Sequence, residues 1–262
     1  MTKYAMRSMY VAPKDHLLVE WDLSQAETWI TAYLAREEKM KFFLHNSDIH
    51  TETASFVDKV PKDQVTPVSR YKGKKANHSL SYGSSYLRLA QSINAESDSP
   101  PYVTVSLVEA KRIFDAWHML YIGIHQWQQE IQEQTKWTRT LVTPHGRERT
   151  FYAEWGPELW KEMYANIPQS TVADHLNGMI QDELGVPGGL LEVKRRFLRK
   201  GIERIIYQGH DSFGCEIHKN NINSLVEPVT ALIKRPMIIN GEVFTIPVDC
   251  KQGERWGELE KI

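Results

Sequence analysis

Strand-like segments lie near both ends of this chain, whereas helical patterns fill its middle. Residues 17–22, LLVEWD, read as a short strand, and residues 204–217 read as two strands around a tight turn. A further strand, VFTIPVDCK, is predicted at 243–251. Helical spacing is found at 24–34, 45–95, 106–136, 158–182 and 190–200. The pattern predicts an α+β fold, in which a helical insertion interrupts a small sheet.

The composition is that of an ordinary soluble globular protein. The 262 residues are 41% apolar and 25% charged, with 32 Lys and Arg against 33 Asp and Glu. This balance does not exclude a nucleic-acid partner, because local patches rather than totals set the binding field. Cys215 and Cys250 form neither a disulfide framework nor a metal-ligand spacing. With no apolar run of ~18 residues and no signal peptide, we expect a cytoplasmic protein without a membrane partner.

Two aspartates stand where predicted strands end. Asp22 closes the strand LLVEWD, and Ser24, with Glu27 three residues on, is the predicted N-cap of the helix that follows. Asp211 lies in the tight turn of the second strand pair. Asp211 is read either as an ordinary turn residue or, together with Asp22, as half of a site for divalent cations. The second reading requires the two strands to be neighbours, which the sequence alone leaves open.

A stripe of four polar residues follows at helical spacing. Arg70, Lys74, His78 and Tyr82 are four apart, so they line one face of a helix roughly 18 Å long. Arg and Lys one turn apart suit a triphosphate, and the two rings suit a base or sugar. The alternative is a solvated basic face. Lys72 and Lys75 fall off this stripe, and we predict that they are solvated.

These features together resemble DNA polymerases of family A, and the resemblance covers nearly the whole chain in order. The matching segments are DLSQAE (22–27, motif A), DIH (48–50), Arg70 through Gly83 (motif B), TPHGRER (143–149), NIPQSTVAD (166–174), His210-Asp211-Ser212 (motif C) and Gly253-x-x-Trp256. In the family, NIPQSTVAD corresponds to the start of a helix.

The resemblance implies a fold described as a right hand. It assigns the palm, a small antiparallel sheet with helices, to residues 1–35 and 166–262, and mostly helical fingers to residues 36–165. The thumb is expected to be absent, as in one piece of a split, phage-like polymerase. A second polypeptide that carries the thumb or exonuclease region is therefore an expected partner, beside primer–template DNA and deoxynucleoside triphosphates.

Carried over by position, the resemblance gives each matching residue a role. Asp22, Asp211 and the Leu23 carbonyl are expected to bind two Mg²⁺ ions, with Mn²⁺ as a substitute, and Lys74 to protonate the departing pyrophosphate. Glu27 is expected to crowd the sugar 2′ position, hydrogen-bonded to Tyr82. The expected nucleotide-binding residues are Arg70, Lys74, His50, Glu27, Gln25, His78 and Tyr82. The expected DNA-binding residues are Gln169, His210 and Arg147.

Three features depart from the family pattern. His78 stands where the family has Phe or Tyr, at a position that affects discrimination against dideoxynucleotides, and Ser212 replaces a glutamate of motif C. Residues 194–200, KRRFLRK, hold five basic residues in seven and are either a DNA patch or a solvated helix face.

The predicted activity is template-directed DNA synthesis by two-metal phosphoryl transfer, with pyrophosphate release. Two alternatives stay open at the level of the sequence. One is a non-catalytic remnant that binds DNA or a partner chain. The other is a single-subunit RNA polymerase, which Glu27 disfavours because a glutamate at that place selects against ribose.

Overall fold

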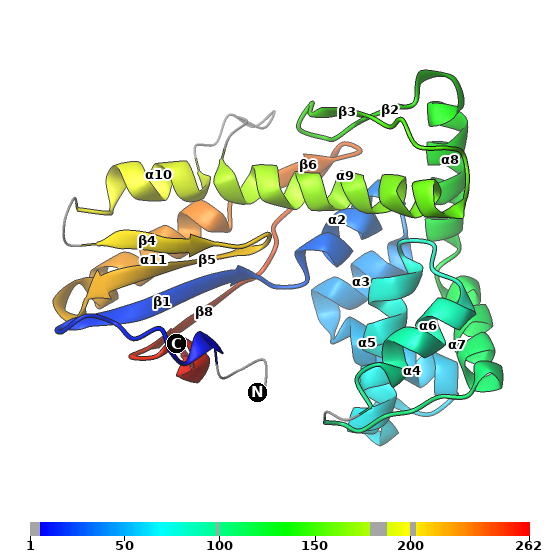
Figure 1. The fold of residues 1–262 in the computed structure, drawn as a ribbon, viewed down its shortest axis with the longest axis horizontal. Helices are drawn as coiled ribbons and strands as arrows, with labels where there is room; N and C mark the ends of the chain where they lie inside the picture. Colours follow the sequence, from blue (N-terminus) through cyan, green and yellow to red (C-terminus); the bar gives the residue numbers. More distant parts are fainter. Residues whose placement is uncertain (1–5, 98–99, 179–187, 200–202) are drawn as a thin grey trace. The chain divides into compact units, whose positions relative to one another are not determined.

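The computed structural model describes residues 6–97, 100–178, 188–199 and 203–262 (Figure 1). The chain divides into two compact units, one formed by residues 1–26 and 169–262 and the other by residues 27–168. The sequence analysis placed the boundaries between palm and fingers at residues 35/36 and 165/166. That assignment stays a prediction. Within the described residues, no helix is both long enough and apolar enough to cross a membrane.

The first unit is built on a five-stranded sheet in the order β4-β5-β1-β8-β9, and every neighbouring pair is antiparallel. The strands are β1 (His16–Leu23), β4 (Arg204–Gln208), β5 (Ser212–His218), β8 (Val248–Gly253) and β9 (Glu260–Lys261). The unit also holds the helices α10 (Gly189–Arg196) and α11 (Ile222–Ile233), with short 3₁₀ turns at Lys219–Asn221 and Trp256–Glu258. Strands from near the two ends of the sequence thus combine in one sheet, as the sequence pattern predicted.

Side chains of β1 alternate between an apolar face and an acidic face of the sheet. Trp21 is fully buried, stacks on Phe213 with ring centroids 5.1 Å apart, and donates a 3.0 Å hydrogen bond to Thr230 of α11. Glu20 and Asp22 point the opposite way, since successive strand residues face opposite sides. Burying the apolar face fixes the register, so the acidic residues are held on the other face.

The predicted strand at 243–251 is wrong in its extent. This stretch forms the end of β7 (Glu242–Phe244), which pairs with β6 (Met237–Ile239), and then most of β8. Pro247 stands between the two strands, and proline has no N–H to donate to a ladder. Its carbonyl accepts a 2.8 Å hydrogen bond from the Ser24 N–H, beside the end of β1.

The second unit is mainly helical. Its elements are α2 (Ala26–Leu34), α3 (Glu38–Asn46), α4 (Ile49–Asp58), a 3₁₀ turn (Lys62–Gln64), α5 (Pro67–Leu80), α6 (Tyr86–Asn94), α7 (Leu107–Leu120), α8 (Ile122–Thr138), the hairpin of β2 (Thr140–Val142) and β3 (Glu148–Thr150), and the first half of α9 (Pro157–Asn177). Side-chain caps mark several starts: Asp48, Thr66, Ser85 and Ser106 each accept a backbone N–H at the beginning of a helix.

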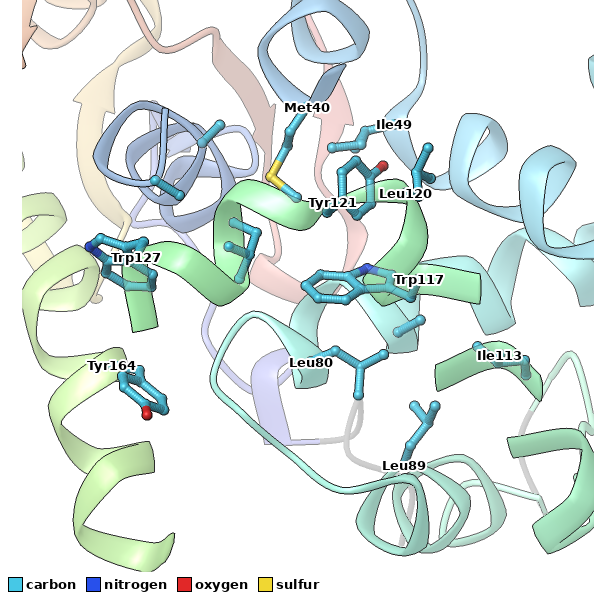
Figure 2. Packing of buried hydrophobic residues seen from close by; sticks show 14 of the residues in the cluster. Met40, Ile49, Leu80, Leu89, Ile113, Trp117, Leu120, Tyr121, Trp127 and Tyr164 are labelled. Carbon is cyan, nitrogen blue, oxygen red and sulfur yellow. The ribbon is translucent and has the colours of Figure 1, made fainter. Parts of the chain in front are cut away.

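One apolar core holds these helices together. Trp117 and Tyr121 lie at its centre with Leu80 and Ile113, and all four are at most 1% exposed (Figure 2). The polar ends of the two large rings are satisfied, because Trp117 donates to Asn77 and the Tyr121 hydroxyl bonds to Thr53.

Three boundaries differ from the sequence prediction. The first helix begins at Ala26 rather than directly after Ser24, because Gln25 has a left-handed backbone with φ of 57°. Helix α5 ends at Leu80, so Tyr82 lies in the turn that follows and not on the helix. NIPQSTVAD does not begin a helix as the resemblance implied, but lies inside α9, whose start at Pro157 agrees with the helical spacing predicted from residue 158. Predicted helical residues 179–182 lie outside the described residues.

Candidate active site

Asp22 lies on the central strand of the sheet. Its neighbour across β5 is Ser212, and its neighbour across β8 is Asp249. Directly paired residues of an antiparallel sheet project on the same side, so these three side chains share the acidic face. The sequence analysis missed Asp249, and the only signal for it was its place in the predicted last strand.

Asp211 is held at the start of β5 by the turn that precedes it. The Gly209 N–H donates to the Ser212 carbonyl at 2.6 Å, which closes the turn. The Leu23 N–H donates to the Asp211 carbonyl at 2.8 Å, which ties the end of β1 to this turn. The strands that carry Asp22 and Asp211 are therefore neighbours, which is what a shared cation site requires.

The Asp22 carboxyl is unusually reluctant to ionise. Burial raises its pKa from 3.8 to about 6, and the negative charges of Asp211, Glu20 and Asp249 act in the same direction, while Lys251 opposes them. Two neighbouring carboxylates, supplemented by substrate phosphates, are the oxygen donors that Mg²⁺ favours, so the residues present fit this ion. Among the described residues, no three His, Cys, Asp or Glu side chains form a metal-binding group.

A second feature of the acidic face surrounds Glu20. Its carboxylate accepts hydrogen bonds from the Tyr207 hydroxyl and, at 2.8 Å, from Trp256 Nε1. The two rings stack with centroids 4.5 Å apart. Tyr207 lies across Gly214, where an added Cβ would come within 2.2 Å of the ring. The sequence analysis did not identify this cluster, because its members come from four distant strands and turns.

In the helical unit, α5 carries the predicted basic stripe. Arg70 makes a bidentate pair with Asp48, at 2.8 Å from Nε and 2.9 Å from Nη2. Partial burial alone would raise the Asp48 pKa, yet hydrogen bonds from Arg70 and Thr51 lower it to about 2. Lys74 is exposed and, within the described residues, takes part in no ion pair.

His50 is buried beside this stripe, and its hydrogen bonds fix its tautomer. Trp117 Nε1 can only donate, so the atom that Asn77 presents to it at 2.9 Å is the carbonyl oxygen. The Asn77 amide nitrogen then donates to His50 Nδ1 at 3.1 Å, which leaves the imidazole proton on Nε2. Burial lowers the His50 pKa to about 4, partly opposed by Asp48 and reinforced by Arg70 and Lys74. His50 is thus a neutral donor at neutral pH.

Helices α4 and α5 approach each other closely at Gly73. A Cβ built there would lie 2.5 Å from the His50 carbonyl oxygen and 3.2 Å from the Ala54 nitrogen, so only glycine fits. The sequence analysis joined His50 to the stripe of α5 only through the family resemblance. The structure shows that Asp48 and His50, at the start of α4, belong beside it.

Glu27 and Tyr82 meet as the resemblance implied, since the Tyr82 hydroxyl donates to the Glu27 carboxylate. The Tyr82 ring lies edge-on to His78, with centroids 6.1 Å apart. These two rings line an open cleft of about 570 Å³ together with Arg88, Glu158 and Lys161. Tyr82 therefore reaches the cleft from a turn rather than from the predicted helical face.

The remaining predicted residues lie at the surface. Gln25, Gln169, His210 and Arg147 are exposed, in the turn after β1, on α9, in the β4–β5 turn and at the tip of the β2–β3 hairpin, respectively. Their positions leave the roles implied by the resemblance as predictions.

Lys72 and Lys75 differ from the prediction, whereas both readings of the basic run 194–200 stay open. Lys72 and Lys75 are not solvated: they pair with Glu109 at 2.5 Å and Glu96 at 2.7 Å, because α6 and α7 pack beside α5. In the basic run 194–200, Arg195 and Arg196 both pair with Glu192. Residue 200 of that run lies outside the described residues.

Residues 2–258 match the sequence pattern of DNA polymerase family A. The chain belongs to this family. DNA polymerase I of Pseudomonas aeruginosa is 25% identical over 260 residues, which cover 97% of this chain and 26% of the relative. The thermostable DNA polymerase I of Thermus thermophilus is 30% identical over 262 residues, which cover 96% of this chain and 28% of the relative.

The fold agrees with that of a solved POL domain. The POL domain of Pol1 from M. smegmatis, in complex with DNA primer–template and dNTP, superposes with a TM-score of 0.76 and 22% identity. The match covers 98% of this chain and 43% of that one. This chain therefore spans about a quarter of the length of the curated relatives it matches and less than half of the solved domain.

Proposed function

We propose that this chain carries the polymerising centre of a family A DNA polymerase, which adds deoxynucleotides to a primer 3′ end on a DNA template and releases pyrophosphate. The observation that carries the proposal is the pairing of β1 with β5, which brings Asp22 beside the turn that holds Asp211. Two acids on neighbouring strand ends are what in-line phosphoryl displacement with divalent cations requires.

Asp22 and Asp211 are the side chains that would hold two Mg²⁺ ions, with the Leu23 carbonyl as a further oxygen donor and Mn²⁺ as a substitute. When bound, such ions polarise the phosphate and neutralise the charge that develops on it. The raised pKa of Asp22 supports this assignment, because a cation would relieve the repulsion between Asp22 and Asp211 that the protein alone leaves in place.

The stripe on α5 is proposed to hold the triphosphate of the nucleotide. Arg70 presents a planar fork suited to two phosphate oxygens, although Asp48 occupies that fork in the free protein. Lys74 is the exposed cation one turn further along, and we assign to it the proton donated to pyrophosphate. The neutral His50 contributes an Nε2–H donor rather than a charge.

Sugar selection is assigned to Glu27 and Tyr82. Their mutual hydrogen bond holds the glutamate in place, so a ribose 2′ hydroxyl would meet a fixed carboxylate. His78 lies against Tyr82 and is proposed to affect recognition of the 3′ position. Gln25 completes the proposed nucleotide-binding set. Gln169, His210 and Arg147 are the proposed contacts to primer–template DNA.

The test is extension of a labelled primer–template with Mg²⁺ and either dNTPs or rNTPs, by the chain and by Asp211→Ala. The proposal expects extension with dNTPs only, lost in the variant. Mn²⁺ binding, followed by electron paramagnetic resonance, gives a readout apart from activity and should weaken in Asp211→Ala. Binding of primer–template without extension would refute self-sufficient synthesis and direct the search to a second polypeptide that carries a thumb.

A further inference from the structure

The two most exposed large apolar side chains in the described part of the molecule belong to one small region. Tyr152 is 88% exposed and Trp137 is 86% exposed. Trp137 lies in the last turn of α8, and Tyr152 is the second residue after β3. Figure 1 shows α8 and the β2–β3 hairpin that carry them. Neither ring is packed into the protein, so both are accessible to an external ligand.

The backbone that carries these rings is firmly held. Arg139, with a left-handed backbone at the end of α8, donates from Nε to the Phe151 carbonyl at 2.9 Å, and the Phe151 N–H returns a 2.9 Å bond to the Arg139 carbonyl. Trp137 is two residues before this clamp and Tyr152 one residue after it. The two rings are therefore presented from a fixed base, which lowers the entropy lost when a ligand binds.

The same arginine joins the hairpin to α9. Its guanidinium lies 4.2 Å from the centroid of Trp155, and Trp155 stacks on Trp160 with centroids 4.7 Å apart. Trp155 contacts both Arg139 and Trp160 and is 42% exposed, about half as much as Trp137 and Tyr152. Trp155 thus packs against the protein, whereas the rings of Trp137 and Tyr152 are exposed to solvent. We call these two residues the hairpin platform.

Cations lie beside the platform, and part of their charge is balanced by glutamates: the Lys136 ammonium lies 3.8 Å from the Glu133 carboxylate, and Arg149 pairs with Glu162. Residues 136–155 contain four Lys or Arg and two Glu, although the whole chain has one more acidic than basic residue. The Lys136 ammonium lies 5.9 Å from the centroid of Trp137, and Arg147 is exposed at the tip of the hairpin. Aromatic rings interleaved with cations are the arrangement that binds single-stranded nucleic acid, in which bases stack and phosphates pair with the cations.

Polar side chains separate the two rings, which distinguishes the platform from a protein-docking patch. Thr138 and Thr140 follow Trp137, and the Thr140 hydroxyl bonds to that of Thr150 across the hairpin at 2.8 Å. A docking surface for another protein needs a contiguous apolar area. Isolated rings beside hydroxyl groups instead suit separate bases, each of which offers a π face.

We propose that the hairpin platform binds the unpaired part of the template strand, by stacking of its bases on Trp137 and Tyr152. The assignment of the strand as template rests on the proposed polymerase function. The stacking itself requires only a single-stranded nucleic acid with flexible, accessible bases.

The experiment measures binding of a fluorescently labelled 12-nucleotide oligo(dT) to the whole chain by anisotropy. Trp137→Ala and Tyr152→Ala should each weaken binding at least about fivefold, since one lost base–aromatic stack has an effect of this size. Trp137→Phe should retain most of the affinity. Tyr102→Ala is the matched control, because Tyr102 is also a strongly exposed aromatic residue, 69% exposed, but lies outside the hairpin.

Salt dependence separates stacking from charge. The slope of log affinity against log salt should be unchanged in Trp137→Ala, whereas Lys136→Ala should reduce its magnitude by about 0.7, as expected for one lost phosphate contact. Equal affinities of wild type, Trp137→Ala and Tyr152→Ala would overturn the proposal and leave the platform as a docking site for protein. This assay involves no catalysis, so failure of primer extension does not bear on it.

Discussion

Replacement of Asn77 by leucine tests the buried hydrogen bonds that orient His50. Asn77 is 1% exposed and joins Trp117 Nε1, at 2.9 Å, to His50 Nδ1, at 3.1 Å. Leucine fills the space but accepts and donates nothing, so one buried N–H and one ring nitrogen lose their partners. Each such orphan costs about 1–3 kcal/mol, and we expect Asn77→Leu to lower the free energy of unfolding by about 2–6 kcal/mol.

Urea denaturation followed by circular dichroism measures this loss. Asn46→Leu is the control, because Asn46 is an exposed asparagine of α3, and its change should stay within about 0.5 kcal/mol. Trp117→Phe removes the N–H that Asn77→Leu leaves without a partner. It should therefore lower the free energy of unfolding less in the Asn77→Leu background than in the wild type. Additivity of the two changes within about 0.5 kcal/mol would show that the hydrogen bond to Trp117 does not cause the loss.

Three further predictions concern His50, Gly214 and His78. Burial lowers the His50 pKa from 6.5 to about 4, so the unfolded chain takes up the proton first as the pH falls, and wild-type stability declines between pH 6.5 and 4. Urea midpoints of His50→Gln should decline less over this window, and a parallel decline would contradict the account. Gly214→Ala should cost about 1–3 kcal/mol, because the new methyl group displaces the Tyr207 ring, whereas Gly156→Ala, with open space around it, should stay within about 0.5 kcal/mol in the same denaturation assay. His78→Phe should change the ratio of dideoxy- to deoxynucleotide incorporation in terminator assays, and an unchanged ratio would exclude a role for His78 in 3′ selection.

Much of the fold could be predicted from local sequence patterns. Apolar alternation identified β1, β4 and β5, and helical spacing identified most of the helical unit. The errors lie where a single residue overrides the periodic pattern. Pro247 divides the last predicted strand because it cannot donate to the ladder, and the positive φ of Gln25 delays the first helix. Such local backbone constraints leave little trace in the spacing of apolar residues.

The candidate site was predictable only where motifs are contiguous. Asp22, Asp211 and the stripe of α5 stand in short recognisable segments, and Glu27 and Tyr82 could be joined through the resemblance. Asp249 and the partners of Glu20 could not be found in this way. They meet through strand register and side-chain packing, which depend on pairings between distant segments that one sequence does not contain.

The Asp48 carboxylate accepts four hydrogen bonds, two from Thr51 at 2.9 and 2.5 Å and two from Arg70 at 2.8 and 2.9 Å. The hydrogen bonds from Thr51 cap the N-terminus of α4. Those from Arg70 orient this side chain of α5, which is proposed to hold a phosphate. The Asp48 carboxylate therefore stabilises two helices. Any anion that binds Arg70 in its place removes two of the four hydrogen bonds to Asp48. Helix order and anion affinity are linked through Asp48, so a change in either one alters the other by the same free energy.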